Sequence, residues 1–254
     1  MCTGRLDRYE AGVKSLQQQT TKKGNHLRAR HRQMKTPLFH RRIDYGFTLI
    51  ELMVVVMISV VIAGFAIPKY LTMQQSLRIS GDSSSLAGLI GEAKLQAAAN
   101  FTHTRVYADL NANTYRLEIW NKNAGCWQTD GDVTHPCTVA GVSPIQYLSQ
   151  GVIFGFGTVT IPPANTQSTL AQAPLCYTGY AGQAGNTFTV PNTACIEFNS
   201  RGVPVDPTAN GAPNAKDAFY VTDGASVFGN TLLASGLIQK WYTPNVSTAA
   251  WQQH

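Results

Sequence analysis

The sequence predicts an α+β protein in which one long N-terminal helix packs on an antiparallel β-sheet head. Residues 47–67 form an apolar run of 21 residues with one charge, Glu51. Apolar residues then recur at helical spacing, so we expect a helix of 53 residues from Phe47 to Ala99. After Asn100 the pattern changes to a period of two, which is typical of strands.

The apolar run, residues 47–67, is long enough to cross a bilayer as a helix, which takes about 20 apolar residues. A carboxylate in such a segment costs roughly 2.5–3.5 kcal/mol on insertion scales, and it usually marks a functional residue. Glu51 is therefore a candidate functional residue. The alternative is a plain signal anchor whose glutamate reaches the lipid headgroups.

Residues 68–99 continue the helix as an amphipathic segment. Its apolar face can pack on a sheet and consists of Ile79, Leu86, Ile90, Ala93 and Ala97. Ser80–Ser85 is a poor helix former, because its glycine costs about 1 kcal/mol relative to alanine. We therefore expect a kink or a loosening of the helix near Gly81.

Residues 100–254 are expected to form one β-rich domain, which is large enough to have a hydrophobic core of its own. Thr104–Leu110 and Thr114–Trp120 flank Asn111–Asn113, which is a good hairpin signal. Residues 121–144 are predicted to be a loop. Further strands are expected at 152–156, 194–198, 218–222, 231–234 and 237–241.

The net charge of +6 is distributed unevenly along the chain. Residues 1–46 hold 11 Lys/Arg and three Asp/Glu, which gives a formal charge of +8. Residues 47–254 hold nine Lys/Arg and 11 Asp/Glu, which gives a formal charge of −2. A basic segment before an apolar run is typical of a cytoplasmic leader. Residues 1–35 are polar and lack apolar periodicity, so no fold is expected for them. The basic charge is therefore no sign of nucleic-acid binding.

The hexapeptide Gly46-Phe-Thr-Leu-Ile-Glu51 resembles the processing site of type IV prepilins and type II secretion pseudopilins. The resemblance implies that prepilin peptidase cuts between Gly46 and Phe47 and that the new amine of Phe47 is methylated. It also implies an assembly role for Glu51, and Pro68 matches a common pilin position. A leader of 46 residues is long for this family, so either the true start is Met34 or the residues before it are a disordered extension.

The chemistry of these residues is consistent with the resemblance. Gly46 has no Cβ, which suits close approach of an enzyme to the backbone. After cleavage the amine of Phe47 lies about 6 Å of helix rise from Glu51. In a filament, the amine of a neighbouring subunit can neutralise the carboxylate, which is how a buried charge is normally tolerated.

The resemblance implies a non-enzymatic minor pilin or pseudopilin, anchored once in the inner membrane with its head in the periplasm. Its partners would be prepilin peptidase and the other pilin subunits of a pilus or pseudopilus. Within the superfamily, Ile196–Gly202 and Ser235–Gly236 resemble the minor pseudopilin H / FimT branch. FimT-type pilins of DNA uptake carry an arginine pair after the late glycine, whereas Gly236 is followed here by Leu237–Lys240. A pilin that binds DNA or another ligand remains the alternative, and DNA is the less expected partner.

Four cysteines remain after removal of the leader, which contains Cys2. Four cysteines allow three pairings, and the sequence does not decide between them. We prefer the local pairing, Cys126 with Cys137 and Cys176 with Cys195, because each bond would close a loop rich in Gly, Pro and Asn. A metal site at Cys126, His135 and Cys137 is the alternative; it lacks a fourth ligand, and an oxidising compartment favours disulfides.

No catalytic constellation is found in the sequence, and no cofactor or metal is expected. The head histidines before the terminal His254 are His103 and His135, and neither adjoins a Ser or Cys nucleophile motif. Asp130 and Asp132 are candidates for Ca²⁺, as in some pseudopilin heads. Two carboxylates in a disulfide loop are, however, more often a solvated turn.

Overall fold

The computed structural model describes residues 47–132, 137, 144–185, 188–214 and 216–254. Its contacts divide the chain after Leu52, and residues from Met53 onward form one compact unit. That unit contains most of helix α1 (Leu49–Ala99) and all of the β-strands. The α+β class predicted from the sequence is therefore confirmed.

Helix α1 has 51 residues and covers both predicted helical segments. The Thr48 hydroxyl accepts a hydrogen bond from the backbone N–H of Glu51, at 3.3 Å, as an N-cap residue does. The helix continues through Ser80–Ser85, so the expected loosening near Gly81 is wrong.

Tertiary contacts explain why α1 tolerates this weak sequence. Asp82 accepts hydrogen bonds from the backbone N–H and the hydroxyl of Ser149, at 2.8 and 2.9 Å. Ser83 is buried, and its carbonyl accepts a hydrogen bond from the side chain of Asn230, at 2.9 Å. These bonds hold the turn in place, and tertiary context of this kind routinely overrides helix propensity.

Three antiparallel sheets make up the head. The seven-stranded sheet has the order β10-β9-β8-β1-β2-β3, with β4 also paired to β2. Its strands are β1 (Thr104–Asp109), β2 (Thr114–Asn121), β3 (Cys126–Thr129), β4 (Gln146–Tyr147), β8 (Thr193–Phe198), β9 (Pro204–Asp206) and β10 (Ala212–Pro213). A 3₁₀ turn, η1 (Pro207–Ala209), separates the last two strands.

The second sheet has five strands in the order β14-β13-β12-β11-β5. They are β5 (Ile153–Phe154), β11 (Ala218–Thr222), β12 (Ser226–Leu232), β13 (Ile238–Pro244) and β14 (Gln252–Gln253). The third sheet pairs β6 (Cys176–Tyr177) with β7 (Thr189–Val190).

The β1–β2 hairpin is as predicted, with Asp109 opposite Thr114. Two other expectations are wrong. The strand expected at 231–234 is β12, which begins at Ser226 and ends at Leu232, and the stretch expected to be a loop contains β3. Gly229 and Asn230 interrupt the apolar pattern of β12, and each has a reason in the tertiary structure. A Cβ at Gly229 would lie 2.6 Å from the Tyr220 ring, and the side chain of Asn230 donates a hydrogen bond to α1.

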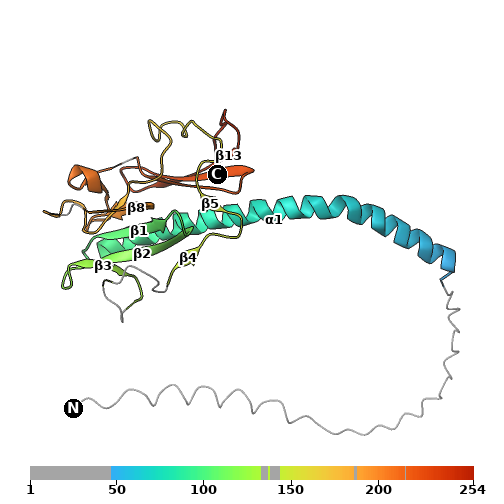
Figure 1. The fold of residues 1–254 in the computed structure, drawn as a ribbon, viewed down its shortest axis with the longest axis horizontal. Coiled ribbons are helices and arrows are strands. Elements are labelled where there is room, and N and C mark those ends of the chain that lie inside the picture. Colours follow the sequence, from blue (N-terminus) through green and yellow to red (C-terminus); the bar gives the residue numbers. More distant parts are fainter. Residues whose placement is uncertain (1–46, 133–136, 138–143, 186–187, 215) are drawn as a thin grey trace, which may run out of the picture. The chain divides into compact units, whose positions relative to one another are not determined.

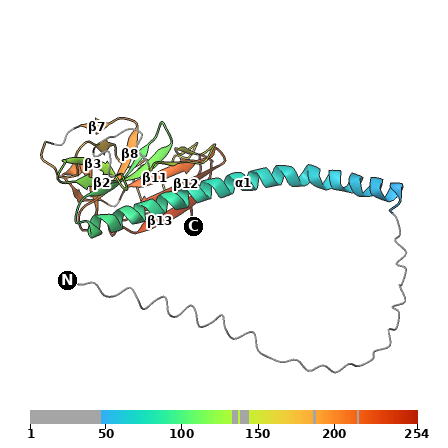
Figure 2. The ribbon, with the colours of Figure 1, turned by 90° about the horizontal axis from the view of Figure 1, so that it is seen from below.

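One core joins α1 to both large sheets, and Figures 1 and 2 both show the C-terminal half of α1 running alongside the strands. The helix contributes the apolar face predicted from its spacing, including Leu86 and Ile90. Val106 and Ile196 belong to the seven-stranded sheet, and Phe219 belongs to the five-stranded sheet. The amphipathic half of α1 is therefore an integral part of the head.

The opposite face of the seven-stranded sheet carries a buried polar cluster that the sequence did not predict. The Nε atoms of Arg105 and Arg116 lie 2.6 and 2.7 Å from the two carboxylate oxygens of Glu118. The Arg105 guanidinium also lies 4.1 Å from the centre of the Trp127 ring. The Trp127 indole N–H donates to the carbonyl of Gly179, in the segment between β6 and β7. Charged and polar groups thus tie this segment to the sheet.

Candidate functional site

The N-terminal half of α1 is the first candidate site. By length and composition α1 is able to cross a membrane, and none of its apolar stretch is buried within the structure. The exposed side chains include Phe47, Leu52 and Phe65. An apolar surface of this extent marks a site of contact with lipid or protein.

Glu51 lies in the first turn of α1 and is exposed, like the apolar residues around it. A carboxylate is favoured there because the N-terminal end of a helix carries a partial positive charge. Among the described residues, none of the ion pairs includes Glu51. Its carboxylate is therefore available to a cation outside the chain. Gly46, on the other side of the predicted cleavage point, lies outside the described residues.

Pro68 lies inside α1, one residue after the apolar run ends. A proline has no N–H to donate to the carbonyl four residues earlier, which here is Gly64, and it weakens the helix at that turn. The residue thus marks the end of the apolar run, whereas the part of α1 that packs in the head begins at Ile79, its first buried residue.

Two disulfides are present, and they follow the local pairing that we preferred. Cys126 and Cys137 have Cα atoms 5.5 Å apart, and those of Cys176 and Cys195 are 5.0 Å apart. The second bond is buried and links β6 to β8. His135, the third residue of the alternative metal site, lies outside the described residues. Within the described ranges, no group of three His, Cys, Asp or Glu residues could hold a metal.

The structure gives the surroundings of the other described residues that the sequence singled out. The Nδ1 atom of His103 lies 2.9 Å from the Glu197 carboxylate. Asp130 is half-buried and Asp132 is buried, at the wall of a pocket described below. The Trp251 indole N–H donates to the carbonyl of Ile161, so this aromatic residue has a structural use.

The N-terminal segment also connects the chain to known proteins. Residues 41–67, which include Gly46, Phe47 and Glu51, match the model of the prokaryotic N-terminal methylation motif. Over 114 residues the chain is 29% identical to the type II secretion system core protein G of Pseudomonas aeruginosa, a match that covers 44% of this chain and 78% of that protein. Both matches support a relationship of the chain to type IV pilins and type II secretion pseudopilins.

Among solved structures, the chain is similar to the minor pseudopilin EpsH from the type 2 secretion system of Vibrio cholerae. The similarity covers 70% of this chain and 96% of that one, with 7% identity and a TM-score of 0.30. Proteins of the superfamily are structural subunits, and in general they are not enzymes.

Proposed function

We propose that this protein is a non-enzymatic minor pilin or pseudopilin that assembles into a type IV pilus or a type II secretion pseudopilus. The observation that carries the proposal is the exposed apolar half of α1, which directly follows the methylation motif and has Glu51 as its one charge. Burial of apolar surface is worth about 25 cal/mol per Å². Before assembly, the lipid bilayer would bury the apolar half of α1. After assembly, a bundle of such helices from several subunits would bury it.

Proteolytic processing prepares the chain to move from the lipid bilayer into the filament. Prepilin peptidase cuts between Gly46 and Phe47, and the methylated amine of Phe47 keeps a positive charge close to Glu51. In the filament the carboxylate of Glu51 pairs with the Phe47 amine of a neighbouring subunit. A buried carboxylate that loses such a partner is strongly destabilising, so the pairing also selects the correct register between subunits.

The proposed topology has residues 1–46 in the cytoplasm and the head in the periplasm before assembly. The basic leader supports this orientation through the positive-inside rule. Two disulfides in the head support an oxidising compartment. The stretches Ile196–Gly202 and Ser235–Gly236 favour the minor pseudopilin H / FimT branch over a major subunit.

The intact mass of the membrane-derived protein tests processing. We expect a chain that begins at Phe47 and carries a methyl group. A mass that retains residues 34–46, in cells with an active prepilin peptidase, would overturn the proposal.

Glu51→Ala tests assembly. The variant should insert into the membrane normally, because it removes the one charge of the apolar segment. It should enter sheared filaments at a small fraction of the wild-type level, because it cannot pair with the neighbouring amine. Ser59→Ala is the matched control, since Ser59 is a polar residue of the same segment whose hydroxyl donates to a carbonyl of its own helix, that of Val55. Normal incorporation of Glu51→Ala would show that Glu51 merely reaches the headgroups.

A further inference from the structure

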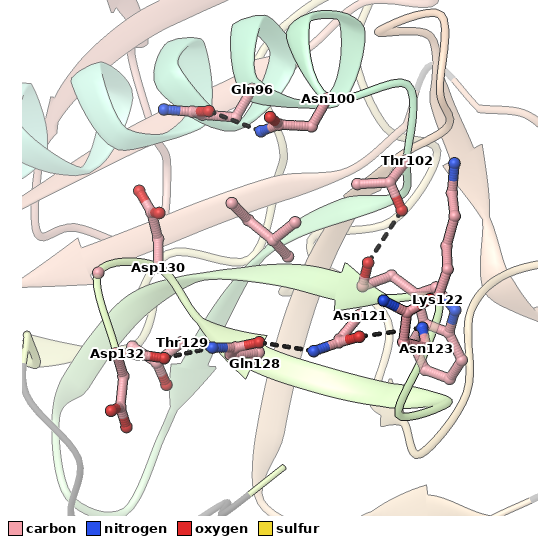
Figure 3. Close-up of a pocket in the computed structure, with 13 residues that line it drawn as sticks. Gln96, Asn100, Thr102, Asn121, Lys122, Asn123, Gln128, Thr129, Asp130 and Asp132 are labelled. Carbon is pink, nitrogen blue, oxygen red and sulfur yellow. Dashed lines mark hydrogen bonds between the residues drawn. The ribbon is translucent and has the colours of Figure 1, made fainter. Parts of the chain in front are cut away.

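A pocket of about 580 Å³ lies between the C-terminal end of α1 and the β2–β3 hairpin (Figure 3). The pocket forms because the apolar core between α1 and the sheet does not extend to the tip of the β2–β3 hairpin. Along the helix-facing side of β2, the core residue Leu117 is followed by Ile119 and then by Asn121. Ile119 lies opposite Gln128 of β3, so the pocket has an apolar floor at Ile119 and polar groups beyond it.

Hydrogen bonds within each wall hold the amide side chains in place. On α1, the Asn100 side-chain nitrogen donates to Gln96 Oε1, at 2.9 Å. On the hairpin, the Asn121 side-chain nitrogen donates to Gln128 Oε1, also at 2.9 Å. The pair on α1 keeps the NH₂ group of Gln96 and the carbonyl oxygen of Asn100 for a ligand. These groups are pre-organised, which lowers the cost of ordering side chains on binding.

Asp130 stands on the other side of the pocket and points towards the helix (Figure 3). In the part of the chain that the structure describes, no donor bonds to its carboxylate, although the residue is only half-exposed. The pocket therefore offers a donor at Gln96, an acceptor at Asn100 and a strong acceptor at Asp130 around an apolar floor.

The charges of the pocket restrict the ligand further. Asp130 and Asp132 outnumber Lys122 among the lining residues, and the Lys122 ammonium already donates to the carbonyl of Phe101, at 2.7 Å. An anionic ligand would thus meet a net negative site, in which Lys122 is the one cation among the described lining residues. Phosphates and uronic acids are disfavoured for this reason.

We propose that this pocket binds a neutral saccharide through Gln96, Asn100 and Asp130. Neighbouring sugar hydroxyls both donate and accept hydrogen bonds, which matches an amide pair that offers one group of each kind. The C–H face of a sugar ring suits the floor at Ile119. The volume is within the roughly 300–1,000 Å³ of small-molecule sites. This ligand site is a function beyond assembly, and it lies at the opposite end of α1 from the apolar half.

The test uses the full chain in micelles of a zwitterionic detergent, because a sugar-based detergent would compete for the site. Calorimetric titrations with cellobiose, maltose and lactose should show saturable binding of at least one of them. Glucuronic acid should bind at least tenfold more weakly than glucose.

Two variants locate the site. Gln96→Ala and Asp130→Asn should each raise the Kd of the bound disaccharide at least fivefold. Gln75→Ala and Glu92→Gln make matched chemical changes at exposed positions of α1 outside the pocket, and they should leave the Kd unchanged. Asp130→Asn is nearly isosteric and breaks no hydrogen bond of the described chain, so it remains decisive even where Gln96→Ala affects folding. The proposal is overturned by an absence of saturable binding, by a Kd that Asp130→Asn does not change, or by a preference for glucuronic acid.

Discussion

Phe101 occupies a backbone conformation that normally favours glycine. It follows α1 with a φ of 50°, and its side chain is 74% exposed. The backbone N–H of Thr102 then bonds to the carbonyl of Ala97, at 3.2 Å, which closes the end of the helix. Helices commonly end on a glycine in this left-handed conformation, because it has no Cβ to clash.

We expect Phe101→Gly to raise the free energy of unfolding by about 0.5–1 kcal/mol, since it removes this strain and little buried surface. Urea unfolding of the full chain in micelles measures the effect. Phe101→Ala is the control, because it removes the ring and keeps the strain. Equal stabilities for the two variants would contradict the explanation.

Asp217 is 3% exposed, and its Oδ2 atom has no hydrogen-bond partner among the described residues. Burial, with a contribution from the negative charge of Asp206, raises the pKa of Asp217 to about 7. The folded protein thus keeps this proton to about pH 7, whereas the unfolded chain releases it near pH 4. Stability should therefore fall as the pH rises from 4 through 7, by up to about 4 kcal/mol at 1.36 kcal/mol per pKa unit.

Asp217→Asn should remove this pH dependence and raise stability at pH 8. The Asn214 amide, which donates to Asp217 Oδ1 at 2.6 Å, finds an equivalent oxygen in the variant. Unfolding free energies at pH 5 and pH 8 provide the measurement, with Glu92→Gln as the exposed control. A wild-type protein that is more stable at pH 8 than at pH 5, with the difference unchanged in Asp217→Asn, would refute this prediction.

At the scale of elements, the two disulfides differ in exposure. Cys176 and Cys195 are 0% and 2% exposed, whereas Cys126 and Cys137 are each partly exposed. Exposed disulfides are the more easily reduced. A low concentration of dithiothreitol should therefore release the thiols of Cys126 and Cys137 first, as followed by alkylation and mass spectrometry.

Replacing both Cys126 and Cys137 by Ser should cost roughly 2–4 kcal/mol, because it frees a closed loop in the unfolded chain. The same bond encloses Asp130 and Asp132, so the variant should also weaken saccharide binding. Simultaneous reduction of both disulfides would show that the head opens as one unit before any thiol reacts.

At the scale of the whole molecule, charge argues against DNA as a partner. From Asn100 onward the chain has six Lys/Arg and eight Asp/Glu. Arg105 and Arg116 are buried against Glu118, so they offer no charge to a phosphate. Arg201, Lys216 and Lys240 lie on a turn, a loop and strand β13, far apart in the sequence. Non-specific DNA binding depends on clustered cations.

We therefore expect no gel shift of duplex DNA by the processed full-length protein at physiological salt. Binding that is tight and salt-dependent, and that disappears in Arg201→Ala or Lys240→Ala, would favour an uptake pilin instead. A shift that persists in both variants would place the DNA contact elsewhere and would also contradict the expectation.

The features that were predictable from the sequence are local ones. The apolar run with Glu51 and the methylation motif lie within one continuous segment, and the β1–β2 hairpin is specified by two alternating stretches and the turn between them. The cysteine pairs are 11 and 19 residues apart, which made local loops the simplest choice. Patterns of this kind reflect helix and strand periodicity, which acts over a few residues.

Contacts between distant segments decided the rest. Ser83 and Asn230 are 147 positions apart, and their bonds hold α1 through a stretch that its propensity alone would loosen. The ion pairs of Arg105 and Arg116 with Glu118, and the pocket between Gln96 and Asp130, likewise depend on how α1 and the sheets pack. Side chains of this type are usually solvated, and only the packing of the complete head turns them into a buried network and a ligand site.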